Sequence, residues 1–188
     1  MALALRPLPP PLTHVRYSEV LGALSCALDL TEGQPAGHTI RACLIGMRIG
    51  QEVGLDDARL SALHYALLLK DAGCSSNAAR MCALFGSDDH VVKRRMKLVD
   101  WHDRARLALA TWRLTALGGP LGEKARRFAG IARTEHMTRD LMQVRCERGA
   151  DIALQLGFPD ATAQAIRSLD EHWNGGGYPQ GLAGDAIP

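Results

Sequence analysis

The most informative stretch of this sequence runs from Asp170 to Pro179, where two carboxylates precede a glycine-rich turn. Residues 158–168 have helical composition, but the three consecutive glycines and Tyr178–Pro179 cannot continue a helix. Glycine disfavours a helix by roughly 1 kcal/mol per position and proline by about 3. Asp170 and Glu171 therefore stand at a helix C-terminal end, where the helix dipole favours cations instead. Their presence indicates a metal, a basic partner or a ligand; the alternative is a solvated helix end before a surface turn.

The same stretch resembles the signature of the HD-GYP domain, a branch of the HD phosphohydrolase superfamily. That signature reads His-His-Glu, two residues, Asp-Gly, one residue, Gly-Tyr-Pro, then a short glycine-rich segment and Ile-Pro. The positions that fit it are Glu171, Gly175, Gly177, Tyr178, Pro179, Gly181, Leu182, Gly184, Ile187 and Pro188. Leu169 and Asp170 occupy the two His positions, and Asn174 occupies the Asp position. The loop of the signature is retained, while the positions where its chemistry would lie are changed.

The resemblance implies a helical bundle whose pocket holds two or three metal ions on His and Asp side chains. In that family the metals activate a water that attacks a phosphodiester, typically of cyclic di-GMP, and clustered metals lower the pKa of the water and stabilise developing charge. The first ligand of the family is a His that opens a helix with an Arg three residues later. His38 and Arg41 fit that pattern, whereas Gln34 stands where some members carry a ligand Glu. His38 is also open to a plainer interpretation, a helix-start residue bonded to the backbone.

Basic residues occupy the next ligand positions that the resemblance implies. The name-giving His-Asp pair ends a buried helix; here it reads Lys70-Asp71, followed by Gly73. The next ligand, a His four residues before a glycine, is replaced by Arg145 before Gly149. With Leu169 and Asp170 in the last two His positions, four of the five His ligands are missing. This is the pattern of a degenerate member.

Side-chain chemistry suggests what the basic replacements do. A lysine ammonium offers no lone pair to a metal, and arginine stays protonated. Two fixed cations can instead compensate the neighbouring carboxylates. Because adjacent residues of a helix do not face each other, we expect the partner of Asp71 to be Arg145 or His38 and not Lys70. The predicted pocket comprises His38, Lys70, Asp71, Arg145, Asp170 and Glu171.

The pocket therefore predicts no metal cofactor. The alternative is a reduced metal site, in which His38, Asp71 and Asp170 hold one Mg²⁺, Mn²⁺ or Fe ion, the first two being hard cations that prefer oxygen ligands. Cys74 is expected to be a small apolar residue, because no histidine base accompanies it in the local sequence.

Composition sets the limits of the remaining interpretations. The chain has 188 residues, and its hydrophobic content of 47% is ordinary for a globular protein. Its net charge of +2 is too small for a dedicated nucleic-acid surface. No apolar run approaches the roughly 20 residues that cross a bilayer, and residues 1–12 lack the apolar core of a secretory signal. Five cysteines without a CxxC pair suggest reduced thiols in a cytoplasmic protein.

Hydrophobic periodicity is helical along nearly the whole chain. It predicts helices over 17–30, 38–53, 56–72 and 141–156. In the second of these, Ala42, Ile45, Ile49 and Val53 form one apolar stripe. Residues 65–69 are apolar on every side, which indicates a helix buried in the core. The basic middle, with the run Lys93 to Lys97, reads as a solvated helical region in two parts split at 118–120, with nucleic-acid binding as the alternative.

These observations predict an all-α, HD-domain-like helical bundle. We expect a proline-rich arm over residues 1–15 and one domain over 16–188 that carries a basic helical insertion at about 87–139. The resemblance implies a further helix after Pro188, so we expect a domain truncated at its C-terminus, either because the sequence is a fragment of a longer protein or because that helix is absent. We expect a bacterial, cytoplasmic signalling module without catalysis. Its expected ligand is a phosphorylated compound or a nucleotide, and its expected partner is a signalling protein. The chain could also form a homodimer. The loop offered to a signalling partner comprises Asn174, Gly175, Gly177, Tyr178 and Pro179. The alternative function is a metal-dependent phosphohydrolase acting on cyclic dinucleotides.

Overall fold

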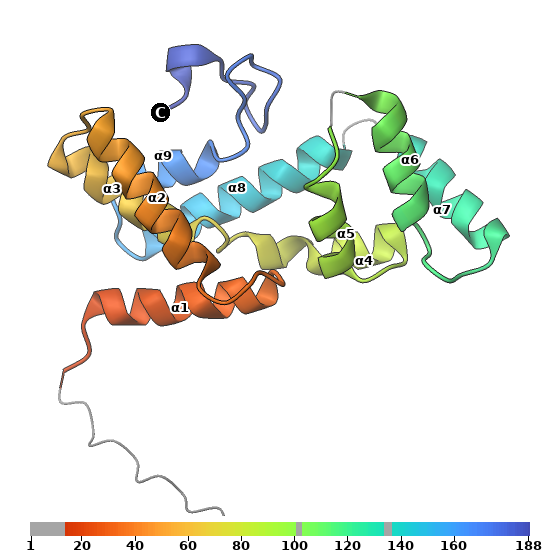
Figure 1. The fold of residues 1–188 in the computed structure, drawn as a ribbon, viewed down its shortest axis with the longest axis horizontal. Helices are drawn as coiled ribbons and strands as arrows, with labels where there is room; N and C mark the ends of the chain where they lie inside the picture. Colours follow the sequence, from red (N-terminus) through yellow and green to blue (C-terminus); the bar gives the residue numbers. More distant parts are fainter. Residues whose placement is uncertain (1–13, 101–102, 134–136) are drawn as a thin grey trace, which may run out of the picture.

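The computed structural model describes residues 14–100, 103–133 and 137–188, and these form nine α-helices, two 3-10 helices and no strand (Figure 1). The α-helices are α1 (Tyr17–Thr31), α2 (His38–Glu52), α3 (Asp57–Leu69), α4 (Ala78–Phe85), α5 (Asp89–Met96), α6 (Arg104–Leu114), α7 (Leu121–Arg133), α8 (Met137–Gln155) and α9 (Asp160–Arg167). The all-α prediction is confirmed. Residues 1–13 of the predicted arm lie outside the described part of the chain. Within that part, no helix has both the length and the apolar character needed to cross a membrane.

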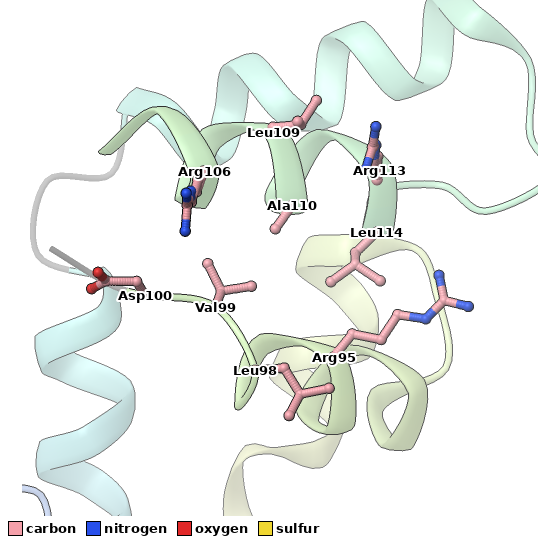
Figure 2. A pocket seen from close by; sticks show the side chains of 9 residues that line it. All are labelled: Arg95, Leu98, Val99, Asp100, Arg106, Leu109, Ala110, Arg113 and Leu114. Carbon is pink, nitrogen blue, oxygen red and sulfur yellow. The ribbon is translucent and has the colours of Figure 1, made fainter. Parts of the chain in front are cut away.

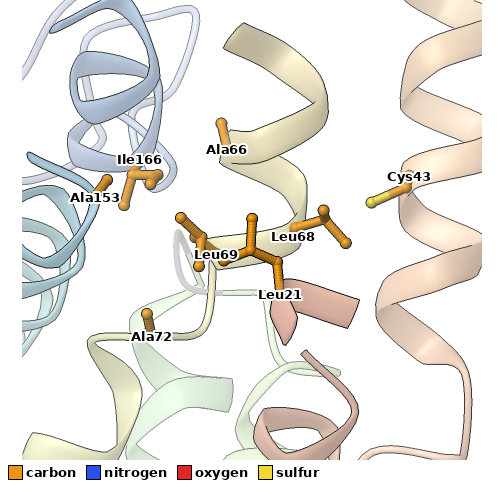
Figure 3. Close-up of a cluster of buried hydrophobic side chains, with 8 residues drawn as sticks. All are labelled: Leu21, Cys43, Ala66, Leu68, Leu69, Ala72, Ala153 and Ile166. Atoms are coloured by element: carbon orange, nitrogen blue, oxygen red, sulfur yellow. The ribbon is translucent and has the colours of Figure 1, made fainter. Parts of the chain in front are cut away.

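The main core lies where α1, α2, α3, α8 and α9 meet (Figure 3). Its central side chains include Leu21, Leu69 and Ile166, each at most 1% exposed. The last turns of α3 are buried, as their all-round apolar sequence predicts. A second, smaller core of Phe85, Val92 and Leu114 joins α4, α5 and α6. The helices that carry the predicted pocket therefore belong to the first core, and most of the predicted basic insertion belongs to the second.

The predicted insertion forms three helices, α5, α6 and α7, so the prediction of two helical parts was wrong. The missed boundary lies before α6, where the side chain of Asp103 caps the new helix. Its carboxylate accepts hydrogen bonds from the backbone N–H groups of Ala105 and Arg106, both at 3.0 Å. A capping carboxylate satisfies amides that the first helical turn leaves without partners, and this stabilises a helix start at that point.

The apolar stripe predicted for α2 does not face the core. Ile45, Ile49 and Val53 are each more than half exposed. The buried face of α2 is instead formed by small residues, among them Cys43 and Gly50. A Cβ atom on Gly50 would lie 2.9 Å from leucine side chains of α3, so the absence of a side chain lets the two helices approach closely. Hydrophobic periodicity did not identify this face because the contact depends on small size.

Candidate functional site

The turn after α3 presents Asp71. The helix ends at Leu69, three residues earlier than the periodicity predicts, and Lys70 and Asp71 lie in the turn that follows. The ammonium of Lys70 pairs with the Oδ2 atom of Asp71, and the Cys74 thiol donates to its Oδ1 atom at 3.7 Å. The expectation that Lys70 and Asp71 would not meet was therefore wrong. The rule that adjacent residues point apart applies inside a helix, and this pair lies beyond its end.

Gly73 fixes this turn against α8. A Cβ atom at Gly73 would lie 1.9 Å from the carbonyl oxygen of Arg145 and 2.8 Å from the backbone nitrogen of Gly149. Both distances are shorter than real Cβ contacts, and both atoms belong to the backbone, which cannot shift as easily as a flexible side chain. The glycine thus allows the Asp71 turn to touch the α8 backbone at Arg145.

The second ion pair joins α8 to the residues after α9. The guanidinium of Arg145 meets Asp170 Oδ2 at 2.6 Å, and both side chains are about one quarter exposed, at 24% and 25%. The Cys146 thiol donates to the same oxygen at 3.4 Å. Arg145 also has a buried Nε atom with no hydrogen-bond partner among the described residues. Burial disfavours the guanidinium charge most strongly, but Asp170, Cys74, Cys146 and Asp71 together more than offset this and raise the pKa of Arg145 above its ordinary value.

The two ion pairs influence each other. Asp71 contributes to the raised pKa of Arg145, although it pairs with Lys70. Burial raises the pKa of the Cys74 thiol to about 12, against a smaller opposing effect of Arg145. The pKa of Cys146 rises to about 11, first through burial and then through Asp170. Charges of both signs therefore alternate at the junction of the α3 turn, α8 and the end of α9, with both thiols protonated at neutral pH.

His38 opens α2 and lies within the field of these charges. Burial lowers its pKa, Lys70 lowers it further, and Asp29 and Asp71 oppose both effects. The imidazole is thus neutral at pH 7, with a lone pair available. The next residue, Thr39, donates from its hydroxyl to Asp29 Oδ1 at 2.6 Å and from its backbone N–H to both carboxylate oxygens at 3.1 and 3.2 Å.

Asp29 is a buried carboxylate beside the candidate site that the sequence analysis missed. It is 2% exposed, and burial tends to raise its pKa, but the hydrogen bonds from Thr39 together with the charges of His38 and Lys70 lower it overall. The carboxylate holds the first turn of α2 and so positions His38. A signal for it existed, because Asp29 stands near the C-terminal end of α1, where the helix dipole disfavours a carboxylate.

Glu171 organises the glycine loop. Its Oε1 atom accepts the backbone N–H groups of Gln180 at 2.7 Å and Gly181 at 3.2 Å, and its Oε2 atom accepts that of Leu182 at 2.8 Å. No ion pair joins Glu171 to a basic residue in the described part of the chain. The structure therefore places this predicted pocket residue in the loop.

The remaining loop residues hold a compact turn. The backbone N–H of Tyr178 donates to the Asp170 carbonyl at 2.9 Å, and the Asn174 side chain accepts from Gly176 at 3.0 Å. Gly175 has a φ of 75°, and the Tyr178–Pro179 bond is cis. A Cβ atom on Gly177 would lie 2.2 Å from the backbone nitrogen of His172, so only glycine fits there. Asp170 thus takes part both in this loop and in the ion pair with Arg145.

The residues present do not fit a metal ion. Of the three candidate ligands His38, Asp71 and Asp170, both carboxylates are already paired with cations. Among the described residues, no group of three or more His, Cys, Asp or Glu side chains is placed to share an ion. Lys70 and Arg145 offer no lone pair in their charged forms. That the protein binds no metal stays a prediction, which metal analysis can test.

Comparison with known proteins gives the class of protein that this chain is similar to. No family model matches. The chain is 45% identical over 174 residues to the 3'3'-cGAMP-specific phosphodiesterase 3 of Vibrio cholerae serotype O1. The aligned region covers 91% of this chain and 37% of the relative. It also matches the crystal structure of a V. cholerae cyclic GMP-AMP specific phosphodiesterase, V-cGAP3, with a TM-score of 0.58 and 40% identity over 91% of this chain and 36% of that one. The chain thus spans little more than a third of the proteins it matches. Its fold is all-α and HD-domain-like.

Proposed function

We propose that this protein acts on 3'3'-linked cyclic dinucleotides as a phosphodiesterase. The observation that supports this is the 45% identity to a 3'3'-cGAMP-specific phosphodiesterase across nearly the whole chain. Identity at that level favours the phosphodiesterase alternative over the binding module that the altered ligand positions suggested. Because the match covers only 37% of the relative, activity is proposed for the protein and not assigned to the Asp71 site, which is the junction formed by Lys70, Asp71, Arg145 and Asp170 with His38 nearby.

The geometry of the Asp71 site favours a second function, ligand binding without catalysis. Lys70 and Arg145 stand where the resemblance implies metal ligands, and each is held by a carboxylate. A phosphate can compete for such cations, since charge-assisted hydrogen bonds from arginine to phosphate are among the strong ones. His38 is the neutral side chain there that could accept a proton from a bound ligand or water.

Turnover and binding assays on one set of variants separate the two functions. The purified protein is incubated with 3'3'-cGAMP or cyclic di-GMP and Mn²⁺, Mg²⁺ or Fe²⁺, and linear products are quantified by chromatography. Asp71→Asn tests the site, and Asp151→Asn, on an exposed position of α8, is the matched control. Turnover of 3'3'-cGAMP by the wild-type protein is the expected result.

The two variants show whether that turnover depends on the Asp71 site. Turnover lost in Asp71→Asn but not in Asp151→Asn would make the Asp71 site catalytic. Turnover kept in both would place the chemistry elsewhere. Saturable binding without turnover, weakened by Arg145→Met, would establish the binding module instead. If neither cyclic dinucleotide is cleaved or bound, both candidate functions are wrong.

A further inference from the structure

A cavity of about 350 Å³ lies between α5 and α6, apart from the Asp71 site. Arg95 contributes from α5 and Arg106 and Arg113 from α6, and the floor is aliphatic. Figure 2 shows Val99 and Leu114 between the two helices, with Arg106 near one end and Arg95 and Arg113 near the other. Asp100 supplies the one carboxylate of the lining. Three guanidinium groups against one carboxylate give the cavity a positive charge.

The basic residues of α5 make two kinds of contact: some attach the helix to its neighbours, and one lines the cavity. Lys93 pairs with Glu32 at 2.8 Å, and both side chains are largely buried. Arg94 donates to the carbonyl of Gly33 at 3.1 Å. These contacts attach α5 to the connection between α1 and α2. The expectation of a solvated basic face holds for Arg94, Arg95 and Lys97, which are exposed, but not for Lys93. Arg95 is left to face the cavity.

The arginines of the cavity differ in how they are compensated. Arg106 meets the Asp103 carboxylate at 3.1 Å. Arg95 and Arg113 are exposed, and their guanidinium groups make no hydrogen bond or ion pair within the described residues. Two uncompensated guanidinium groups beside an apolar floor are suited to a ligand with an anionic end and a flat apolar body. Arginine binds phosphate oxygens with paired donors, and aliphatic side chains can cover one face of a base.

We propose that this cavity binds a nucleoside monophosphate. Ligand pockets have volumes of roughly 300 to 1,000 Å³, and this cavity lies near the lower limit. A single nucleotide suits that size better than an intact cyclic dinucleotide, which carries two bases and two phosphates. Arg95 and Arg113 would hold the phosphate, and the base would lie against Val99 and Leu114. This site uses none of the residues of the Asp71 site and does not depend on the proposed phosphodiesterase activity.

Calorimetric titration of the purified protein with GMP, AMP and inorganic phosphate tests the proposal. Saturable binding of a mononucleotide, much tighter than that of phosphate, is expected. Arg95→Ala and Arg113→Ala should each weaken it about tenfold or more, the usual effect of losing a charged hydrogen bond. Arg104→Ala, an exposed arginine of α6 outside the lining, should leave affinity unchanged. Ala110→Leu should block the nucleotide without changing the charge.

Three outcomes would overturn the proposal. The first is the absence of saturable nucleotide binding at moderate salt. The second is equal affinity for phosphate and nucleotide, which would reveal a simple anion site without recognition of the base. The third is nucleotide binding that survives both arginine substitutions. Circular dichroism of Ala110→Leu, together with the exposed arginine variants, separates loss of binding from loss of folding.

Discussion

The ion pair between Arg145 and Asp170 should contribute strongly to stability, and its removal gives the sharpest test of the site. The pair is formed at 2.6 Å by side chains about three quarters buried, and Arg145 already has one buried nitrogen without a partner in the described part of the chain. Asp170→Ala would remove the carboxylate that pairs with Arg145 and leave the guanidinium largely buried without its partner. Breaking a fully buried pair in this way costs about 3–5 kcal/mol. Partial exposure reduces this to roughly 2–3 kcal/mol, since water screens the remaining charge.

The assay is a double-mutant cycle followed by urea unfolding. Asp170→Ala, Arg145→Met and the double variant are compared with wild type, and equal m-values establish that the unfolded states are comparable. The double variant should be less destabilised than the sum of the single ones, with a coupling energy on the order of 1–3 kcal/mol. Removing Arg48 from its exposed pair with Glu52 is the matched control, and it should change stability by less than about 1 kcal/mol. Single effects that add within about 0.5 kcal/mol would refute the reasoning.

Three further outcomes follow from the contacts at the site. Glu171→Ala should speed amide hydrogen exchange at residues 180–182, because those amides lose their acceptor. The His38 imidazole should titrate by NMR below 6.5, and Lys70→Met should raise the midpoint, since burial and the lysine charge both lower that pKa. In the unfolded chain His38 gains its proton near pH 6.5, so its contribution to stability is complete above that pH and decreases as pH falls toward the folded pKa. The Cys74 thiol, whose pKa burial raises to about 12, should be alkylated at pH 8 far more slowly than the exposed cysteines.

Each of these outcomes has its own control. For the exchange experiment it is Glu147→Ala, an exposed residue of α8 whose loss should leave the loop amides unchanged. A His38 midpoint that does not respond to Lys70→Met would show that the lysine charge does not reach the imidazole. For the thiols, mass spectrometry should find Cys26 and Cys82 modified first. Equal rates at Cys74 and these two would show that the turn after α3 opens readily.

Some features of the site were predictable because they depend on residue type. The glycine-rich turn could be predicted because three consecutive glycines and Tyr178–Pro179 cannot continue a helix, but the part of Glu171 as acceptor for the amides of residues 180–182 could not. The loss of metal ligands at Lys70 and Arg145 could also be inferred from the sequence, since neither side chain can serve as a metal ligand in its charged form. These inferences need no knowledge of which helices touch.

Other features depend on contacts that no local pattern encodes. The end of α3 could not be placed from local sequence, because the turn that follows it packs at Gly73 against the α8 backbone, more than seventy positions away in the sequence. That early end is also the reason that Lys70 reaches Asp71. Hydrophobic periodicity also chose the wrong face of α2, because this helix contacts α3 through small residues such as Gly50 and not through its apolar stripe.

Metal analysis of the purified protein tests the central claim most directly, namely that fixed cations hold Asp71 and Asp170 at positions where the family resemblance implies metal ligands. The protein is equilibrated with Mn²⁺, Fe²⁺ or Zn²⁺, freed of unbound ions and measured by plasma mass spectrometry beside Asp71→Asn. The account predicts no stoichiometric metal in either protein. One or more ions per wild-type chain, lost in Asp71→Asn, would contradict it.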